Sequence, residues 1–162
     1  MKKLILLLFI PLISFSQISF KDVMLISSLD QFKRVMIENN YESSESDNAG
    51  MIVYGLNIAK DSIKGNSSSS WAFYDETDNK WGLTFNRTNL LSTFLGTDAD
   101  NSENPYDLIV KDIKEKCKYY KIINYNGTDY VTYSCSESSY KGKIGFMVEE
   151  GQGIVRHFPT TE

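Results

Sequence analysis

The sequence predicts an α+β fold in which two units lie in tandem in one compact domain, each unit being a helix followed by an antiparallel sheet (αβββ-like). Two segments, 28–40 and 105–118, have apolar residues at helical spacing, and each is followed by short segments with strand character. Strands that follow a helix and are joined by short turns favour antiparallel sheets with helices on one face. We expect the two units to occupy residues 22–87 and 88–159.

Residues 1–16, MKKLILLLFIPLISFS, have the pattern of a cleaved export signal. Two lysines precede an apolar run from Leu4 to Ile13, and small residues occupy the positions that signal peptidase recognises. The run contains Pro11 and is about ten residues long, whereas a membrane-spanning helix needs about 20 apolar residues. We expect cleavage after Ser16, which leaves a single α+β domain over 17–162. This domain should be secreted, to the periplasm or the exterior, without a stable membrane anchor.

The chain is acidic once this segment is removed. The whole sequence has 17 basic and 21 acidic residues, and loss of the two signal lysines leaves 15 basic residues and a formal net charge of −6. Nucleic-acid binding needs a clustered basic face. The lysines between Lys111 and Lys121 are interleaved with Asp112 and Glu115, a pattern typical of a solvated helix surface. We therefore expect no nucleic-acid partner.

Both predicted helices have recognisable first residues. Ser28 and Gln31 have the spacing of a capping box, and Asn104 is a capping residue followed by Pro105 in the first helical position. The segment 88–96 is ambiguous between a short helix and a strand, and its leucine spacing favours the helix. The helices over 28–40 and 105–118 each have an apolar stripe, which consists of Leu25, Leu29, Phe32, Val35 and Met36 in the first, and of Tyr106, Ile109, Val110, Ile113 and Cys117 in the second.

The segment 70–87 contains two aromatic runs around a polar centre, which predicts a hairpin. A loop of two or four residues sets Tyr74 opposite Trp81, whereas a three-residue loop sets Phe73 opposite Leu83, and both registers remain open. In either case aromatic side chains lie on both faces of the hairpin. Further strands are expected over 51–59, 144–148 and 154–158.

A second hairpin is predicted around Asn126-Gly127, because both central positions of a two-residue turn need positive φ and these residues accept it. This turn sets Tyr120 opposite Tyr133, with Ile122 opposite Val131 and Ile123 opposite Tyr130. One face of the hairpin should lie under the second helix, and its members are Tyr120, Ile122, Val131, Tyr133 and Cys135.

The only two cysteines of the chain, Cys117 and Cys135, flank this hairpin. The predicted register brings them within a residue of each other, with both sulfurs in the seam between helix and sheet. In an exported protein this arrangement favours a structural disulfide. A redox pair is typically a Cys-x-x-Cys at a helix amino terminus, whereas Cys117 ends a helix, and a zinc site needs more ligands than the single histidine, His157, can add.

No sequence motif of a nucleotide-binding, serine hydrolase or metalloprotease site is present. The acidic loop 98–104 begins like a calcium loop but has Glu103 where glycine is needed and Ile109 where glutamate is needed. His157 has no matching catalytic partner and is expected to be a packed or half-exposed residue. We predict no catalytic residue, no metal site and no cofactor.

One surface favours a binding role. Ile123, Tyr125 and Tyr130 should cluster on the face of the second hairpin that the helix does not cover, and an exposed apolar and aromatic patch often marks a contact surface. Cross-strand tyrosines also simply stabilise sheets, which is the plainer explanation. The first hairpin raises the same possibility with a less defined face, through Trp71, Tyr74 and Trp81.

We expect a small exported, non-enzymatic domain that binds a protein or another exported macromolecule through an aromatic sheet face. The two-unit layout is similar in architecture to the tandem-repeat β-lactamase inhibitor proteins, and this similarity implies that such a scaffold can support non-catalytic protein binding. The alternative is an extracytoplasmic hydrolase with two acidic side chains facing each other in a cleft. A structural component of the cell envelope is a third possibility.

Overall fold

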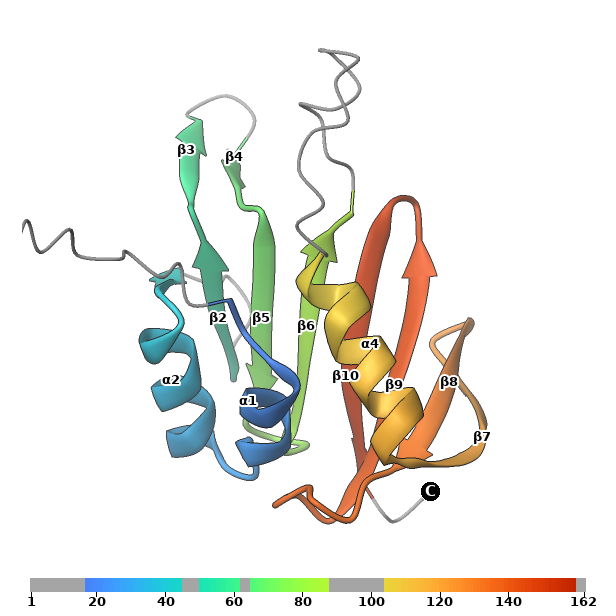
Figure 1. The fold of residues 1–162 in the computed structure, drawn as a ribbon. Coiled ribbons are helices and arrows are strands. Elements are labelled where there is room, and N and C mark those ends of the chain that lie inside the picture. The colour runs from blue at the N-terminus through green and yellow to red at the C-terminus, as the bar shows by residue number, and fades with distance from the viewer. Residues whose placement is uncertain (1–16, 45–49, 62–64, 88–103, 160–162) are drawn as a thin grey trace, which may run out of the picture.

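Eight strands form one antiparallel sheet, and the helices lie on one of its faces (Figure 1). The structure is a computed structural model that describes residues 17–44, 50–61, 65–87 and 104–159. The helices in these ranges are α1 (Phe20–Leu25), α2 (Leu29–Glu38) and α4 (Pro105–Lys116). The strands are β1 (Tyr41–Ser44), β2 (Met51–Leu56), β3 (Ala59–Asp61), β4 (Gly65–Ser67), β5 (Ser70–Asp75), β6 (Lys80–Asn86), β7 (Lys118–Tyr125), β8 (Thr128–Ser134), β9 (Gly142–Glu149) and β10 (Gln152–Pro159), of which β3 and β4 form a separate pair.

The strand order across the large sheet is β1-β2-β5-β6-β10-β9-β8-β7. Two runs of neighbouring strands meet where β6 pairs with β10, and the fully buried Leu83 and Val155 lie opposite each other at this junction. The predicted fold of two tandem helix-plus-sheet units is wrong, because this pairing makes one large continuous sheet that carries only small helices. Apolar periodicity identifies strands but not their distant partners. The architectural similarity to the tandem-repeat inhibitors depended on the two-unit layout and is lost with it.

The helices predicted over 28–40 and 105–118 are both present and begin as expected. Ser28 caps α2 by accepting a hydrogen bond from the Gln31 amide, but the Gln31 side chain accepts from Ser27 rather than completing a box with Ser28. Asn104 caps α4, and a proline occupies its first turn. The six-residue helix α1 was not predicted, because so short a segment shows no clear periodicity. The predicted short helix at 88–96 lies outside the described residues. None of the helices within the described ranges is long and apolar enough to cross a membrane.

The hairpin of β5 and β6 has one of its two predicted registers. Tyr74 lies opposite Trp81, and the alternative with Phe73 opposite Leu83 is wrong. The predicted strand over 51–59 is divided between β2 and β3. The two last predicted strands are present as β9 and β10, which pair along their full length.

The core lies between the helices and the sheet. Phe32 of α2 is fully buried, and its ring centroid lies 5.9 Å from that of Tyr54 and 5.3 Å from that of Tyr74. On the same face of the sheet, Ile109 and Ile113 of α4 are also fully buried. Burying one large apolar side chain contributes roughly 1.5–3 kcal/mol relative to leaving it exposed, so these contacts hold the helices to the sheet.

The β7–β8 hairpin turns at Asn126-Gly127 as predicted, with positive φ at both residues, 52° and 84°. The pairs nearest the turn have the predicted register. A β-bulge farther along β7 then shifts the register, so that Tyr119 rather than Tyr120 lies opposite Tyr133. A bulge adds one unpaired residue to a strand, and nothing in the turn itself determines its position.

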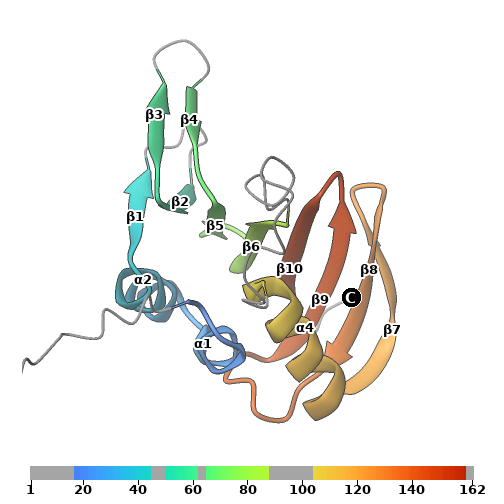
Figure 2. The ribbon, with the colours of Figure 1, turned by 45° about the horizontal axis from the view of Figure 1, so that its top comes forward.

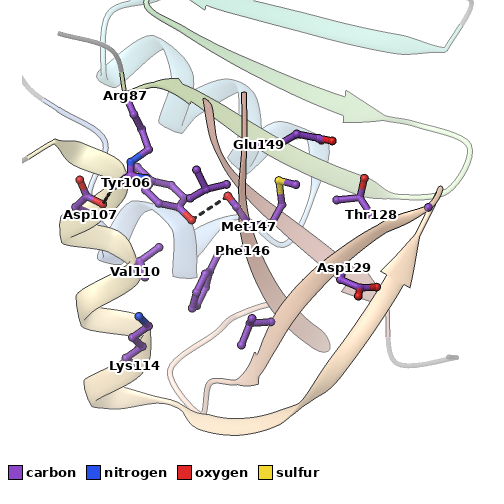
Figure 3. A pocket seen from close by; sticks show the side chains of 13 residues that line it. Arg87, Tyr106, Asp107, Val110, Lys114, Thr128, Asp129, Phe146, Met147 and Glu149 are labelled. Carbon is purple, nitrogen blue, oxygen red and sulfur yellow. Dashed lines mark hydrogen bonds and ion pairs between the residues drawn. The ribbon is translucent and has the colours of Figure 1, made fainter. Parts of the chain in front are cut away.

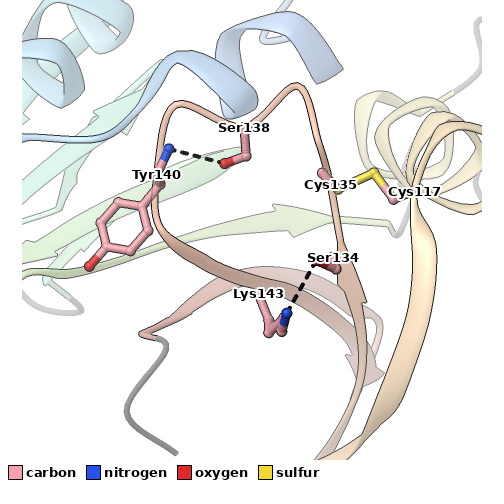
Figure 4. The surroundings of a disulfide bond; sticks show 6 residues. All are labelled: Cys117, Ser134, Cys135, Ser138, Tyr140 and Lys143. Carbon is pink, nitrogen blue, oxygen red and sulfur yellow. Dashed lines mark hydrogen bonds between the residues drawn. A yellow bond between two sulfur atoms is a disulfide. The ribbon is translucent and has the colours of Figure 1, made fainter.

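The predicted disulfide between Cys117 and Cys135 is confirmed (Figure 4). Cys117 is the C-cap of α4 and Cys135 directly follows β8, so the bond ties the end of the helix to the end of the hairpin. Both residues are partly buried and pack against the core. The loop after Cys135 is held to α1, where the Ser139 amide donates to the Met24 carbonyl at 2.9 Å.

Replacing Cys117 and Cys135 with serine should lower the free energy of unfolding by about 3 kcal/mol, because the bond closes a loop of roughly nineteen residues in the unfolded chain. Chemical denaturation followed by circular dichroism measures the difference between the double variant and the wild type. Reduced wild type should show the same loss, which separates the effect of the bond from that of the serines. Equal stability of the three samples would contradict a stabilising role.

Candidate functional site

A groove of about 630 Å³ lies between α4 and the β7–β8 hairpin (Figure 3). Phe146 and Val148 of β9 and Val131 of β8 form its floor, Val110 and Lys114 of α4 line one side, and the tip of the hairpin lines the other. A concave site of this volume with an apolar floor is within the range of known ligand sites.

Tyr106 fixes the position of α4 at one end of the groove. Its hydroxyl donates to the Met147 carbonyl at 2.9 Å. Its ring lies against Gly153 of β10, where an added Cβ would come within 2.5 Å of ring atoms, so only glycine allows this approach. Burial raises the pKa of Tyr106 to about 12, and the hydroxyl therefore remains a hydrogen-bond donor at neutral pH. These contacts hold α4 near β9 and β10.

Charges of both signs surround the apolar floor. Arg87 Nη2 lies 3.0 Å from Asp107 Oδ1, and the two side chains form an ion pair at the rim. Lys114 Nζ lies 5.5 Å from the ring centroid of Phe146 in the floor. Asp129 and Glu149 add carboxylates on the hairpin side and at the end of β9. An apolar centre with a polar rim is the usual composition of a protein contact surface.

The floor of the groove continues onto β7, where it is uncovered. Phe146, Val131 and Ile122 lie opposite one another on adjacent strands, so they share a face. Ile122 is 56 % exposed, Tyr119 is 54 % exposed and Val148 is 49 % exposed. The prediction that the second helix covers this face of the hairpin is wrong for Ile122, and Tyr120 is exposed as well.

The predicted patch of Ile123, Tyr125 and Tyr130 lies on the opposite face of the sheet, the one away from the described helices, which is called the open face below. The exposure expected for it is wrong: Tyr130 is only 4 % exposed, and the other two are half-buried. Tyr130 and Tyr125 both pack edge-on against Phe158 of β10, at centroid distances of 5.3 and 6.1 Å. Whether these residues bind a partner stays a prediction, but the structure places them in a small second core.

The three aromatic candidates of the first hairpin do not form one surface. Tyr74 and Trp81 are buried in the main core on the helix side of the sheet. Trp71 precedes Tyr74 by three residues on the same strand, so its side chain points to the opposite, open face, where it is half-buried. The structure does not bring Trp71 together with the second hairpin's cluster through any ring contact among the described residues.

Sequence reasoning missed the groove. The alternation of Ile144, Phe146 and Val148 predicted a strand with one buried face, but it could not show that Val148 lies beyond the reach of the helix. A usable signal was present in β7, whose sequence KYYKIINY is aromatic or aliphatic on both faces. A strand of that composition at the end of a sheet must leave apolar surface exposed on at least one side.

Within the described ranges, no three histidine, cysteine, aspartate or glutamate side chains come together in a way that could hold a metal ion. No protein-family model, no curated protein and no solved structure matches this chain.

His157 is fully buried on the helix side of β10, between the stacked ring of Trp81 and the ring of Tyr140. Neither ring nitrogen has a hydrogen-bond partner among the described residues. Burial, together with the positive charge of nearby Lys80, lowers the pKa of His157 to about 3. His157 is therefore a neutral packed residue at physiological pH, as expected from the sequence.

The buried His157 should make the fold sensitive to acid. In the unfolded chain histidine binds a proton below about pH 6.5, whereas folded His157 does so only near pH 3. The unfolded state is therefore favoured as the pH falls through this window, by about 1.4 kcal/mol per pH unit. The free energy of unfolding is measured by chemical denaturation of the wild type and of His157→Leu from pH 8 to 4. The difference between the two curves isolates the contribution of His157, because all other groups titrate in both proteins. Parallel stability curves for the two would contradict it.

Proposed function

We propose that this chain is an exported, non-enzymatic domain that binds another protein through the groove and the exposed side of β7. The observation that carries the proposal is the gathering of Tyr119, Ile122 and Val148, all about half exposed, around an apolar floor. Single exposed apolar residues are common, but a contiguous group of them with a polar rim marks contact surfaces. Tyrosine in particular is enriched where binding energy is concentrated.

The location of this surface supports the same proposal. Ile37 is 63 % exposed but belongs to α2, and α2 lies on the opposite side of the molecule from α4 and the β7–β8 hairpin (Figure 1). Ile122 of β7 instead continues the cross-strand row of Phe146 and Val131, and Tyr119 lies on the same face, so that groove and strand form one surface. A partner could bury all of this surface at once.

Two features support export. The amino-terminal segment has the composition of a cleaved signal, and the Cys117–Cys135 bond is of the kind that persists in oxidising compartments. The periplasm or the cell exterior is therefore the proposed destination.

The hydrolase alternative has one observation in its favour, since Asp129 and Glu149 both line the groove. Asp129 accepts a hydrogen bond from the Asn124 side chain at 2.7 Å. If the groove were catalytic, Asp129→Asn and Glu149→Gln would abolish turnover of the bound molecule. Binding by these variants without any detectable turnover by the wild type would favour the non-enzymatic proposal.

Photo-crosslinking tests the binding proposal directly. A benzophenone amino acid placed at position 122 should form a discrete adduct with another exported protein in the producing cells, because Ile122 lies in the proposed contact surface. The same amino acid at position 37 is the matched control, since Ile37 has similar exposure on a distant helix. Both replacements should leave stability within about 0.5 kcal/mol of the wild type, as expected at exposed positions.

An adduct that forms at position 122 and not at position 37 supports the proposal, and it should be reduced when Tyr119 is also replaced by serine. Equal labelling at the two positions, or none at position 122, would overturn it.

A further inference from the structure

β7 ends the sheet on one side and has a single neighbouring strand, β8, in the part of the chain that the structure describes (Figure 2). An edge strand presents a row of backbone N–H and C=O groups with which another extended segment can pair. β7 is eight residues long, and its residues from Lys118 to Ile122 are all exposed. This edge is therefore accessible.

The turn determines which backbone groups of β7 face outward. In a hairpin with a two-residue turn, the residues that flank the turn, here Tyr125 and Thr128, exchange hydrogen bonds, and bonded and non-bonded pairs then alternate along the strands. Ile123 is therefore bonded to β8, whereas the amide and carbonyl groups of Ile122 and Asn124 face the open edge. The bulge at the start of β7 limits the regular edge to the part nearest the turn.

Lysines gather on the open face near this edge, two of them on β7 and one, Lys143, on β9. Lys118 lies opposite Ser134, and Lys143 Nζ donates to the Ser134 hydroxyl at 3.1 Å. The ring of Tyr120 lies between Lys143 and Lys121, with Nζ-to-centroid distances of 4.6 and 5.4 Å. Among the described residues, Lys118, Lys121 and Lys143 form no ion pair with an acidic side chain. The lysine cluster, as these three residues are called below, is thus a basic patch on a chain whose net charge is −4.

The two faces of β7 differ in chemistry. Lys121 belongs to the face of the lysine cluster, and the neighbouring Ile122 belongs to the face of the groove floor. A strand added beside β7 would place alternate side chains on these two faces. Its side chains beside Lys121 should be acidic, and those beside Ile122 should be apolar.

We propose that an extended segment of a partner protein, with alternating acidic and apolar residues, adds to the edge of β7 as a further strand. The backbone bonds to Ile122 and Asn124 supply affinity, and the lysine cluster selects acidic side chains. This inference rests on the proposed function and specifies how the same surface binds. A second copy of this chain pairing through its own β7 is disfavoured, because it would bring two lysine clusters side by side.

A labelled heptapeptide, Thr-Glu-Val-Glu-Val-Glu-Thr, is the probe, and fluorescence anisotropy at low salt measures its binding. Lys121→Glu combined with Lys143→Glu should weaken binding about tenfold or more, since the charge on β7 and a second charge of the lysine cluster are both reversed. Lys21→Glu combined with Lys111→Glu is the matched control, because it changes the net charge equally at exposed positions away from β7. A peptide with lysine in place of glutamate should not bind.

Backbone pairing is tested separately. Two versions of the heptapeptide, N-methylated either at the glutamates or at the valines, keep every side chain unchanged. The version whose methylated amides face β7 should lose binding, because those amides can no longer donate to the strand. Asn124→Pro should also lose binding, because it removes an edge N–H, and proline is tolerated where that group faces outward. Asn124→Ala controls for loss of the side-chain bond to Asp129. The peptide test keeps its meaning even if the proline variant is unstable.

Undiminished binding of both N-methylated peptides, equal effects of the two lysine pairs, or no binding of the acidic peptide would each overturn strand addition. A crosslinked adduct at position 122 together with any of these results would leave the proposed function standing and remove only this inference. Dimers of the wild type in sedimentation that disappear in Asn124→Pro would also overturn it, in favour of pairing between two copies.

Discussion

The pairing of β6 with β10 is the contact on which the rest of the structure depends. It joins residues 82–86 to residues 152–156, which lie far apart in the chain, and it places Leu83 and Val155 in the centre of the core. Without it, each run of strands would have an additional open edge, and unpaired edges invite non-native association. With it, α1, α2 and α4 share one sheet and one core. The long-range pairing therefore decides which strands remain at the edges, and β7 is one of them.

The sheet coils strongly toward its open face at the β7 end. In a flat sheet, β7 and β10 would be about 14 Å apart, because β8 and β9 lie between them and neighbouring strands are about 4.8 Å apart. The rings of Tyr125 and Phe158 are nevertheless separated by 6.1 Å, and the Arg156 guanidinium carbon lies 4.4 Å from the centroid of Tyr125. Gly145 makes room for Phe158, since an added Cβ there would lie 2.5 Å from that ring. The hairpin is thus drawn toward the open face and away from α4, which opens the groove on the other side.

This coiling also explains why some predictions from the sequence were right and others were wrong. Local signals were sufficient for the Asn104 cap, the Asn126-Gly127 turn and the disulfide, because each depends on residues close together in the chain or on a single hairpin register. Side-chain parity correctly separated Ile122 from Tyr130. It could not show which of the two is buried, because that depends on how far α4 extends over the sheet and on the curvature of the sheet. Both of these arise from tertiary packing, which periodicity does not encode.

Both walls of the groove are held in place by contacts within the chain, and this has consequences for binding. On one side, α4 is fixed at its start by Tyr106 against Gly153 and at its end by the bond from Cys117 to Cys135. On the other side, the aromatic cluster around Phe158 holds the hairpin, together with the β8 end of the same disulfide. A surface whose walls are fixed before binding loses little conformational entropy when a partner is bound, so more of the contact energy contributes to affinity. The disulfide then has a role beyond stability, because it cross-links the end of α4 to the end of β8 and so ties one wall of the groove to the other.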